Sequence, residues 1–156
     1  MHTKMLIAFI ALALAPFAWT SRLNRLIRMG TDKPFVVVVD DDASVSRAIR
    51  RLLRSVGIAA DTYTSGDEFL DVLSATPSYR PDCVILDVQM PGANGIEVQR
   101  RLAGSAVPVI FITAHDDAGV REAALAAGAK AYLRKPFNDV LFIRTVCAVL
   151  GIAAPL

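Results

Sequence analysis

Short runs of aliphatic residues recur along this chain and alternate with longer segments in which apolar residues follow a helical spacing. The runs lie at Phe35–Val39, Cys83–Leu86, Val109–Ile112 and Ala131–Arg134, and a weaker one lies at Ala59–Tyr63. Strands that are buried on both faces of a parallel sheet have this continuous apolar character, whereas half-exposed strands alternate polar and apolar residues. The pattern therefore predicts five strands of a buried parallel sheet.

A helix is predicted after each of these strands, because apolar residues in the following segments recur every three or four positions. The segments run over Ser44–Val56, from Ser65 or Gly66 to Ser74, and over Ile96–Leu102, Asp117–Ala127 and Asn138–Leu150. Repeated strand-then-helix units predict an α/β fold, namely a doubly wound five-stranded parallel sheet with helices on both faces.

The first predicted helix has two contrasting sides. The apolar side, which should pack on the sheet, carries Val45, Ile49, Leu52, Leu53 and Val56. The opposite side carries four basic residues at spacings of three and four, which are Arg47, Arg50, Arg51 and Arg54. Such a stripe fits a solvated helix face, and it also fits a docking surface for an acidic partner, so both interpretations stay open.

Acidic and polar residues stand where the predicted strands end. Asp40, Asp41 and Asp42 follow the first strand, and single polar residues follow three others, at Asp87, Thr113 and Lys135. In open α/β sheets, ligands bind at the carboxyl ends of the strands. We therefore expect these acids, the hydroxyl and the ammonium to converge on one site.

Adjacent carboxylates repel one another, and a hard divalent cation relieves that repulsion. Mg²⁺ prefers oxygen ligands and commonly takes one or two carboxylates, keeping several of its waters. Asp40 or Asp41, together with Asp87, fits such a site, whereas Asp42 is better placed to cap the following helix.

Asp87 also fits a second role, because a carboxylate can act as a nucleophile and form an acyl phosphate. The turn that follows it, Val88–Gly92, would present its side chain at the edge of the sheet. Lys135 would supply positive charge for a phosphoryl group, Thr113 could donate a hydrogen bond to it, and the small Ala114 leaves room beside them. A cation and phosphoryl site is the leading interpretation.

The basic charge of the chain lies in its first part. Residues 1–29 contain four basic residues and no acidic one, whereas residues 30–156 contain 13 basic and 15 acidic residues. The positive net charge of +2 is therefore no argument for nucleic-acid binding by the larger part. Cys83 and Cys147 lack the spacing of a zinc site, and we interpret them as small apolar residues in a reducing cytoplasm.

Residues 1–29 form a hydrophobic and basic leader in this interpretation. The apolar run at Met5–Trp19 has 15 residues, fewer than the roughly 20 that a spanning helix needs. Three explanations stay open: a mis-assigned start with translation beginning at Met29, a membrane anchor, or a cleaved export signal. We expect a cytoplasmic protein, associated with a membrane only if residues 5–19 are retained.

Four short motifs resemble the receiver domain of two-component response regulators of the single-domain, chemotaxis type. They are Val-Asp-Asp-Asp at 39–42, Leu-Asp-Val-Gln-Met-Pro-Gly at 86–92, Ile-Thr-Ala-His at 112–115 and Lys-Pro-Phe at 135–137. The resemblance covers residues 34–150, so the chain is expected to divide into the leader, 1–29, and a receiver domain, 30–156.

The resemblance implies a role for each site residue. Asp87 would be the phosphoacceptor, and Mg²⁺ would be held by Asp40, Asp41, Asp87 and the backbone carbonyl of Gln89. Lys135 would pair with the phosphoryl group and precede a cis peptide bond to Pro136. Thr113 and Tyr132 would form a switch, in which the hydroxyl moves toward the phosphoryl group and the aromatic ring turns inward; Tyr132 as a plain aromatic at the edge of the core is the alternative.

The resemblance also implies a function in phosphorelay signal transduction. A histidine kinase or a histidine phosphotransfer protein would donate the phosphoryl group, and the output surface would then change for a partner that the sequence does not identify. We expect no direct nucleic-acid binding, and no enzyme activity beyond self-phosphorylation and autodephosphorylation. The alternatives are an aspartyl-phosphate hydrolase, which would carry an acid where Gln89 stands, and a receiver-like interaction module that is not phosphorylated.

Overall fold

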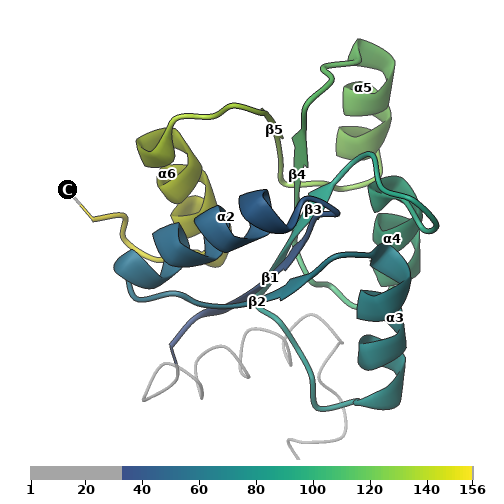
Figure 1. Cartoon of the computed structure of the whole chain (residues 1–156), viewed down its shortest axis with the longest axis horizontal. Helices are drawn as coiled ribbons and strands as arrows, with labels where there is room; N and C mark the ends of the chain where they lie inside the picture. The colour runs from purple at the N-terminus through teal and green to yellow at the C-terminus, as the bar shows by residue number, and fades with distance from the viewer. Residues whose placement is uncertain (1–32, 156) are drawn as a thin grey trace, which may run out of the picture. The chain divides into compact units, whose positions relative to one another are not determined.

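The computed structural model describes residues 33–155, and the predicted leader at 1–29 lies outside them. Five strands and five helices alternate along this part of the chain (Figure 1). In chain order they are β1 (Phe35–Val39), α2 (Ala43–Ser55), β2 (Ala59–Tyr63), α3 (Gly66–Ala75), β3 (Cys83–Asp87), α4 (Gly95–Leu102), β4 (Val109–Thr113), α5 (Ala118–Ala126), β5 (Ala131–Arg134) and α6 (Asp139–Leu150). Among these helices, none combines the length and the apolar character needed to cross a bilayer.

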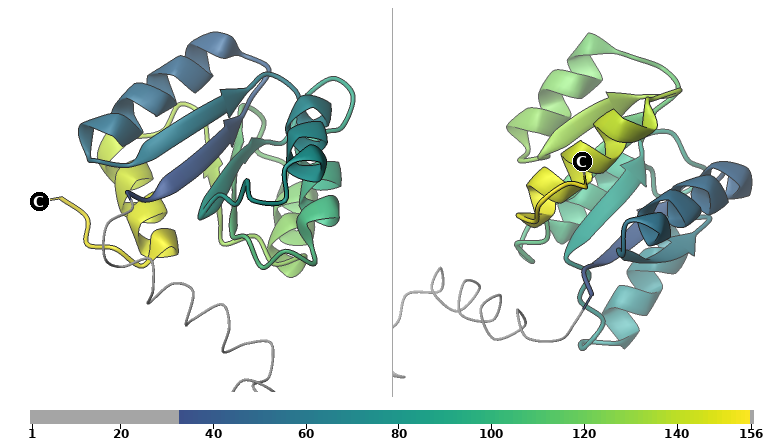
Figure 2. Two further views of the ribbon diagram at one scale, coloured as in Figure 1. Left: turned by 90° about the horizontal axis from the view of Figure 1, so that it is seen from below. Right: turned by 90° about the vertical axis from the view of Figure 1, so that its left-hand side faces the viewer.

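All five strands are parallel and form one sheet in the order β2-β1-β3-β4-β5. The order reverses between β1 and β3, which is the point where doubly wound sheets bind their ligands. Helices α2 and α6 cover one face of the sheet, and α3, α4 and α5 cover the other (Figure 2). The predicted fold class is confirmed.

The strands are buried on both faces because consecutive side chains point to opposite sides of the sheet. In β1, Val36 and Val38 join the core beneath α2 and α6, whereas Val37 and Val39 join the core beneath the other three helices. All four valines are fully buried, and each contributes about 1.5–3 kcal/mol through burial. This two-sided burial explains why the sequence shows continuous apolar runs.

Each helix begins after a polar residue whose side chain accepts hydrogen bonds from the first backbone N–H groups. These residues are Asp42, Ser65, Asn94, Asp117 and Asn138. The predicted helices at Asp117–Ala127 and Asn138–Leu150 therefore begin one residue too early, because those first residues cap the helix from outside it. Asp42 caps α2, as predicted.

The buried side of α2 differs in one position from the prediction. Ile49 and Leu53 are buried as expected, and Val45, Leu52 and Val56 are only partly buried. Ser46 is buried instead, because its hydroxyl donates a 3.3 Å hydrogen bond to the carbonyl oxygen of Asp40. A polar residue on the inner side of the helix thus fixes the backbone at the end of β1. The four arginines on the other side are all exposed.

Candidate functional site

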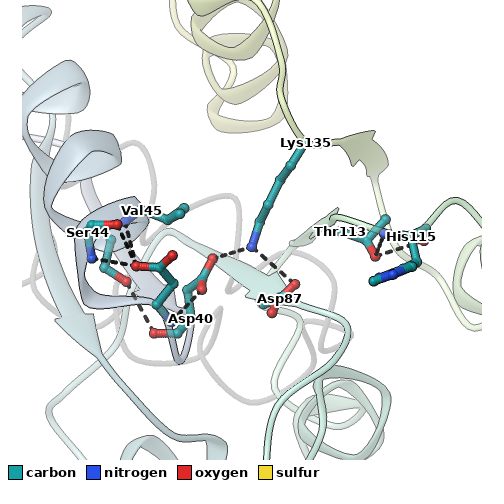
Figure 3. A network of polar contacts seen from close by, with 9 residues as sticks. Asp40, Ser44, Val45, Asp87, Thr113, His115 and Lys135 are labelled. Atoms are coloured by element: carbon teal, nitrogen blue, oxygen red, sulfur yellow. Dashed lines mark hydrogen bonds and ion pairs between the residues drawn. The ribbon is translucent and has the colours of Figure 1, made fainter.

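Backbone hydrogen bonds of the sheet continue one residue past the ends of β1 and β5 and fix the positions of the polar residues there. The N–H of Asp40 donates to the carbonyl oxygen of Tyr63 at 3.1 Å, and the N–H of Lys135 donates to the carbonyl oxygen of Thr113 at 2.7 Å. Asp87, the last residue of β3, pairs in register with Ile112 of β4. The side chains of Asp40, Asp87 and Lys135 consequently start from neighbouring points on one edge of the sheet (Figure 3).

Three carboxylates form a cluster at this edge. Oxygen atoms of Asp40, Asp41 and Asp87 all lie within 4.8 Å of one another. Asp40 is fully buried and Asp87 is 6% exposed, whereas Asp41 faces solvent. The cluster therefore combines two buried acids with one that remains accessible.

Lys135 bridges the two buried acids. Its Nζ lies 2.6 Å from Oδ2 of Asp40 and 3.3 Å from Oδ1 of Asp87 (Figure 3). A single ammonium cannot neutralise three carboxylates, so excess negative charge remains at the site. Burial raises the pKa of Asp87, with Asp40 and Asp41 adding to the rise and Lys135 opposing it. The predicted meeting of Lys135 with the acids is thus present in the structure.

The donor set fits a hard divalent cation. The three residues offer only carboxylate oxygens, which Mg²⁺ prefers, and their net negative charge favours a cation. Oδ1 of Asp40 accepts a 2.9 Å hydrogen bond from the N–H of Asp42, and its Oδ2 contacts Lys135. Each carboxylate oxygen has two lone pairs, so these contacts leave Asp40 able to bind an ion directly or through water.

Thr113 is buried at the end of β4, and its hydroxyl is engaged in a local turn. Its Oγ1 donates to the carbonyl oxygen of His115 at 2.9 Å and accepts from the N–H of His115 at 3.1 Å (Figure 3). The hydroxyl is therefore bonded to its own loop and makes no hydrogen bond to the acids. The structure thus brings the acids and the lysine together, while the Thr113 hydroxyl is bonded to His115.

Gln89 is exposed and lies at the rim of a shallow hollow beside the site. The hollow measures about 530 Å³ and is lined by the loop between β3 and α4, by Ile96 of α4 and by Val120 of α5. The peptide bond between Lys135 and Pro136 is cis, as the family resemblance implied.

Gly95 is a site residue that the sequence analysis missed. A Cβ atom on this residue would lie 2.2 Å from the carbonyl oxygen of Asp87, so only glycine allows α4 to start this close to β3. Its N–H donates to the carbonyl oxygen of Val88 at 3.2 Å. The sequence indicated a turn after Asp87, at Val88–Gly92, but no local pattern showed that Gly95 lies against Asp87.

Tyr132 lies on the same face of the sheet as Phe111, its partner in register, and their ring centroids are 6.1 Å apart. Its hydroxyl is buried and makes no hydrogen bond of good geometry within residues 33–155; burial raises its pKa, and an interaction with the side chain of Thr113 opposes that rise. The guanidinium carbon of Arg121 lies 5.4 Å from the centre of the ring. The ring is therefore partly buried against the core and covered by Arg121, whereas its role in a switch stays a prediction.

Comparisons with known proteins identify the family of this chain. A family model described as the response regulator receiver domain matches residues 36–146. The response regulator protein TodT of Pseudomonas putida is 34% identical over 130 residues, which are 81% of this chain and 56% of TodT. The response regulator MprA of Mycolicibacterium vanbaalenii is 43% identical over 104 residues, 65% of this chain and 44% of MprA. This chain thus spans about half the length of these curated relatives.

The solved structures agree with the sequence relatives. The crystal structure of a response regulator receiver protein from Burkholderia phymatum superposes with a TM-score of 0.74 and 96% identity, over 80% of this chain and all of that one. Receiver domains act in phosphorelay signal transduction and are not conventional enzymes, and the comparisons give no support to a hydrolase or to a module that is not phosphorylated. With the family's sheet order and its strand-end acids in place, the chain belongs to the response regulator receiver family of two-component signal transduction.

Proposed function

We propose that this chain accepts a phosphoryl group on the carboxylate of Asp87 from a histidine kinase or a histidine phosphotransfer protein. One observation carries the proposal: Asp87 is nearly buried at the carboxyl edge of the sheet, with the ammonium of Lys135 at 3.3 Å and two further acids beside it. An acid so placed can act as a nucleophile, and the charges around it can stabilise a transferring phosphoryl group.

In the proposed step, a carboxylate oxygen of Asp87 attacks phosphorus in line with the nitrogen of a phosphohistidine. An O–P bond forms and the N–P bond breaks. The electron pair of the N–P bond stays on the histidine nitrogen, which takes a proton from solvent, so the donor is left as neutral histidine. Little covalent assistance is needed in such a transfer beyond positioning and charge neutralisation. Lys135 supplies positive charge to the phosphoryl oxygens, because its ammonium already contacts Asp87.

Asp40, Asp41, Asp87 and the backbone carbonyl of Gln89 are the groups that would hold Mg²⁺ in this proposal. When bound, the ion neutralises the charge of the acids and of the incoming phosphoryl group. The all-oxygen donor set and its excess negative charge support this assignment.

The proposal includes the Thr113–Tyr132 switch. A phosphoryl oxygen on Asp87 would compete with the carbonyl of His115 for the hydrogen of the Thr113 hydroxyl. A dianion is the stronger acceptor, so the loop after β4 would lose one of the two bonds that hold it. Tyr132 already packs against the core in the unphosphorylated chain, so phosphorylation would stabilise this inward position and thereby alter the surface formed by α5, β5 and α6, where an output partner would bind.

The test is to incubate the full chain with Mg²⁺ and acetyl phosphate and to measure its intact mass. The mass is expected to rise by one phosphoryl group, and Asp87→Asn should abolish the gain. Asp71→Asn is a matched control, because Asp71 is an exposed acid on α3. An unchanged mass in the wild type, or a gain that persists in Asp87→Asn, contradicts the proposal.

Further parts of the proposal concern the context of the domain. We place the receiver domain at 30–156 in the cytoplasm, limit its catalysis to self-phosphorylation and autodephosphorylation, and expect no direct binding of nucleic acid. Residues 1–28 are proposed to be absent because translation begins at Met29, or the leader at 1–29 is proposed to act as a membrane anchor through residues 5–19. Mass spectrometry of the native N-terminus tests this, and a peptide spanning Arg22 to Lys33 contradicts the late start.

A further inference from the structure

Three side chains close together form a cluster next to the site, which we call the Tyr132 clamp: Asp116 in the loop after β4, Arg121 on α5 and Tyr132 on β5. Both carboxylate oxygens of Asp116 lie 2.6 Å from one terminal nitrogen of Arg121. The guanidinium carbon lies 5.4 Å from the centre of the Tyr132 ring, within the range of a cation–π contact. Asp116 thus orients the guanidinium that covers the ring.

The clamp also contains two unsatisfied atoms. Nε of Arg121 and the hydroxyl oxygen of Tyr132 are both buried, and neither makes a hydrogen bond of good geometry in the described part of the chain; the side chain of Thr113 interacts only weakly with the Tyr132 hydroxyl and opposes the rise in its pKa. A buried polar atom without a partner costs free energy, and that cost disappears if the side chain turns into solvent. The inward position of Tyr132 therefore needs a compensating contact, and the guanidinium supplies one over the ring. The hydrogen bonds that the guanidinium donates to Asp116 offset the cost of its own unsatisfied Nε.

The strand register connects the clamp to the candidate site. Tyr132 is paired with Phe111, and Thr113 lies two residues further along the same strand as Phe111. Because side chains alternate along a strand, Phe111 and Thr113 share a face with Tyr132. Asp116 and Thr113 also belong to the same short loop region, where the Thr113 hydroxyl bonds His115. A change in the Thr113 loop thus reaches Tyr132 through a direct neighbour and through Asp116.

We propose that Arg121, held by Asp116, is a positioning residue that keeps Tyr132 in its inward position and so sets the balance of the switch at Asp87. The inference rests on the proposed function for its link to phosphorylation. The clamp itself is independent of it, because the contacts are present in the unphosphorylated chain. Within residues 33–155, the polar contacts of Arg121 and Asp116 are with each other and with the Tyr132 ring, so both residues would act on the site through Tyr132.

The size of the effect follows from the strength of the contact. Cation–π contacts at exposed to partly desolvated sites change an equilibrium by about twofold to thirtyfold. Arg121→Gln removes the cation and keeps a polar side chain of similar reach, so the inward-to-outward ratio of Tyr132 should fall by this factor. If phosphorylation of Asp87 favours the inward position, reciprocity requires that loss of the clamp weakens phosphorylation.

Fluorine NMR measures the position of the ring directly. The full chain has three tyrosines, so incorporation of 3-fluorotyrosine gives three resonances, and Tyr132→Phe identifies the one from Tyr132. A buried ring shows a small change in chemical shift between H₂O and D₂O, and an exposed ring a large one. In the unphosphorylated chain, Arg121→Gln should increase this solvent shift for Tyr132 and leave Tyr63 and Tyr79 unchanged, which also reports an intact fold.

Two controls make the measurement decisive. Arg144→Gln removes an exposed arginine from α6 and should leave all three resonances as in the wild type. Asp116→Asn should move the Tyr132 resonance in the same direction as Arg121→Gln, because the guanidinium loses its anchor. A Tyr132 resonance that Arg121→Gln leaves unchanged, or that moves equally in Arg144→Gln, overturns the clamp.

Phosphorylation by acetyl phosphate tests the link to the switch. We expect a smaller phosphorylated fraction at the plateau of the reaction for Arg121→Gln than for the wild type and for Arg144→Gln. An unchanged plateau together with a shifted Tyr132 resonance overturns the positioning role. If the proposed function is wrong, the wild type itself gains no phosphoryl group. The fluorine measurement is separate from that outcome and still decides whether the clamp holds the Tyr132 ring.

Discussion

Gly95→Ala is expected to disturb the site without changing any charged or hydrogen-bonding side chain. Its added Cβ would lie 2.2 Å from the carbonyl oxygen of Asp87 and 3.0 Å from Cε1 of Phe111. Ordinary contacts between such atoms begin at about 3.5 Å, so α4 and the end of β3 must separate by roughly 1.3 Å. The movement would stretch the 3.2 Å hydrogen bond from the Gly95 N–H to Val88.

The expected cost combines two opposing effects. Overpacking of a rigid site costs about 1–3 kcal/mol, whereas replacing glycine by alanine in a helix gains at most about 1 kcal/mol. The gain is smaller at the first helical residue, so a net loss of about 1–2 kcal/mol in unfolding free energy is expected. A shift of about 1 Å in Asp87 should also slow its phosphorylation by roughly tenfold to a hundredfold.

Urea unfolding gives the free energy, and intact mass against time with acetyl phosphate gives the rate. Gly104→Ala is the matched control, because its added Cβ meets no atom within 4 Å. The control should keep both the stability and the phosphorylation rate of the wild type. If Gly95→Ala behaves like Gly104→Ala in both measurements, the close approach of α4 to Asp87 does not position the acid and the reasoning is refuted.

Three further predictions concern stability. Burial raises the pKa of Asp87 from 3.8. The contribution of this acid to the free energy of unfolding is therefore full below pH 3.8 and is lost as the pH rises through the raised pKa. At pH 7 and without Mg²⁺, Asp87→Asn should be more stable than the wild type. The hydroxyl of Ser44 lowers the pKa of Asp42 from 3.8. The contribution of Asp42 to stability is therefore present above pH 3.8 and is lost as the pH falls through the lowered pKa. The melting temperatures of Asp42→Asn and the wild type should converge in strong acid. Tyr79→Phe removes the hydroxyl that donates to Asp61 at 2.9 Å and should cost about 1–2 kcal/mol in urea unfolding, whereas an unchanged midpoint would refute this.

The elements of this fold could be predicted from the sequence because they follow from local chemistry. The valines of β1 are β-branched and continuous, which predicts a strand buried on both faces. Asp42 stands just before an amphipathic segment, where its side chain caps the helix. The first residues of α5 and α6 could not be predicted to the residue, because Asp117 and Asn138 mark a helix start without showing whether they lie just before the helix or inside it.

The membership of the candidate site could also be predicted from the sequence. The acids at 40–42 and Asp87 each follow an apolar run, and parallel strands bring their carboxyl ends to one edge of the sheet. The sequence could not assign unequal environments to Asp40 and Asp41, which are adjacent in the chain. Burial depends on the direction of each side chain relative to the sheet, and only the fold shows that Asp40 is enclosed while Asp41 faces solvent.

Contacts between distant parts of the chain were decided by the tertiary structure alone. Lys135 reaches Asp40 across 95 positions of sequence, and the sheet order β2-β1-β3-β4-β5 brings them to the same edge. Two further contacts, of Gly95 with Asp87 and of Arg121 with Tyr132, could not be predicted from a local sequence pattern. Each joins two elements whose relative placement depends on packing across the whole sheet. Local propensity and hydrophobic period therefore determined which residues end each strand. The packing of the helices on the sheet decided which of those residues touch and which are buried, because burial and distance are properties of the assembled layers.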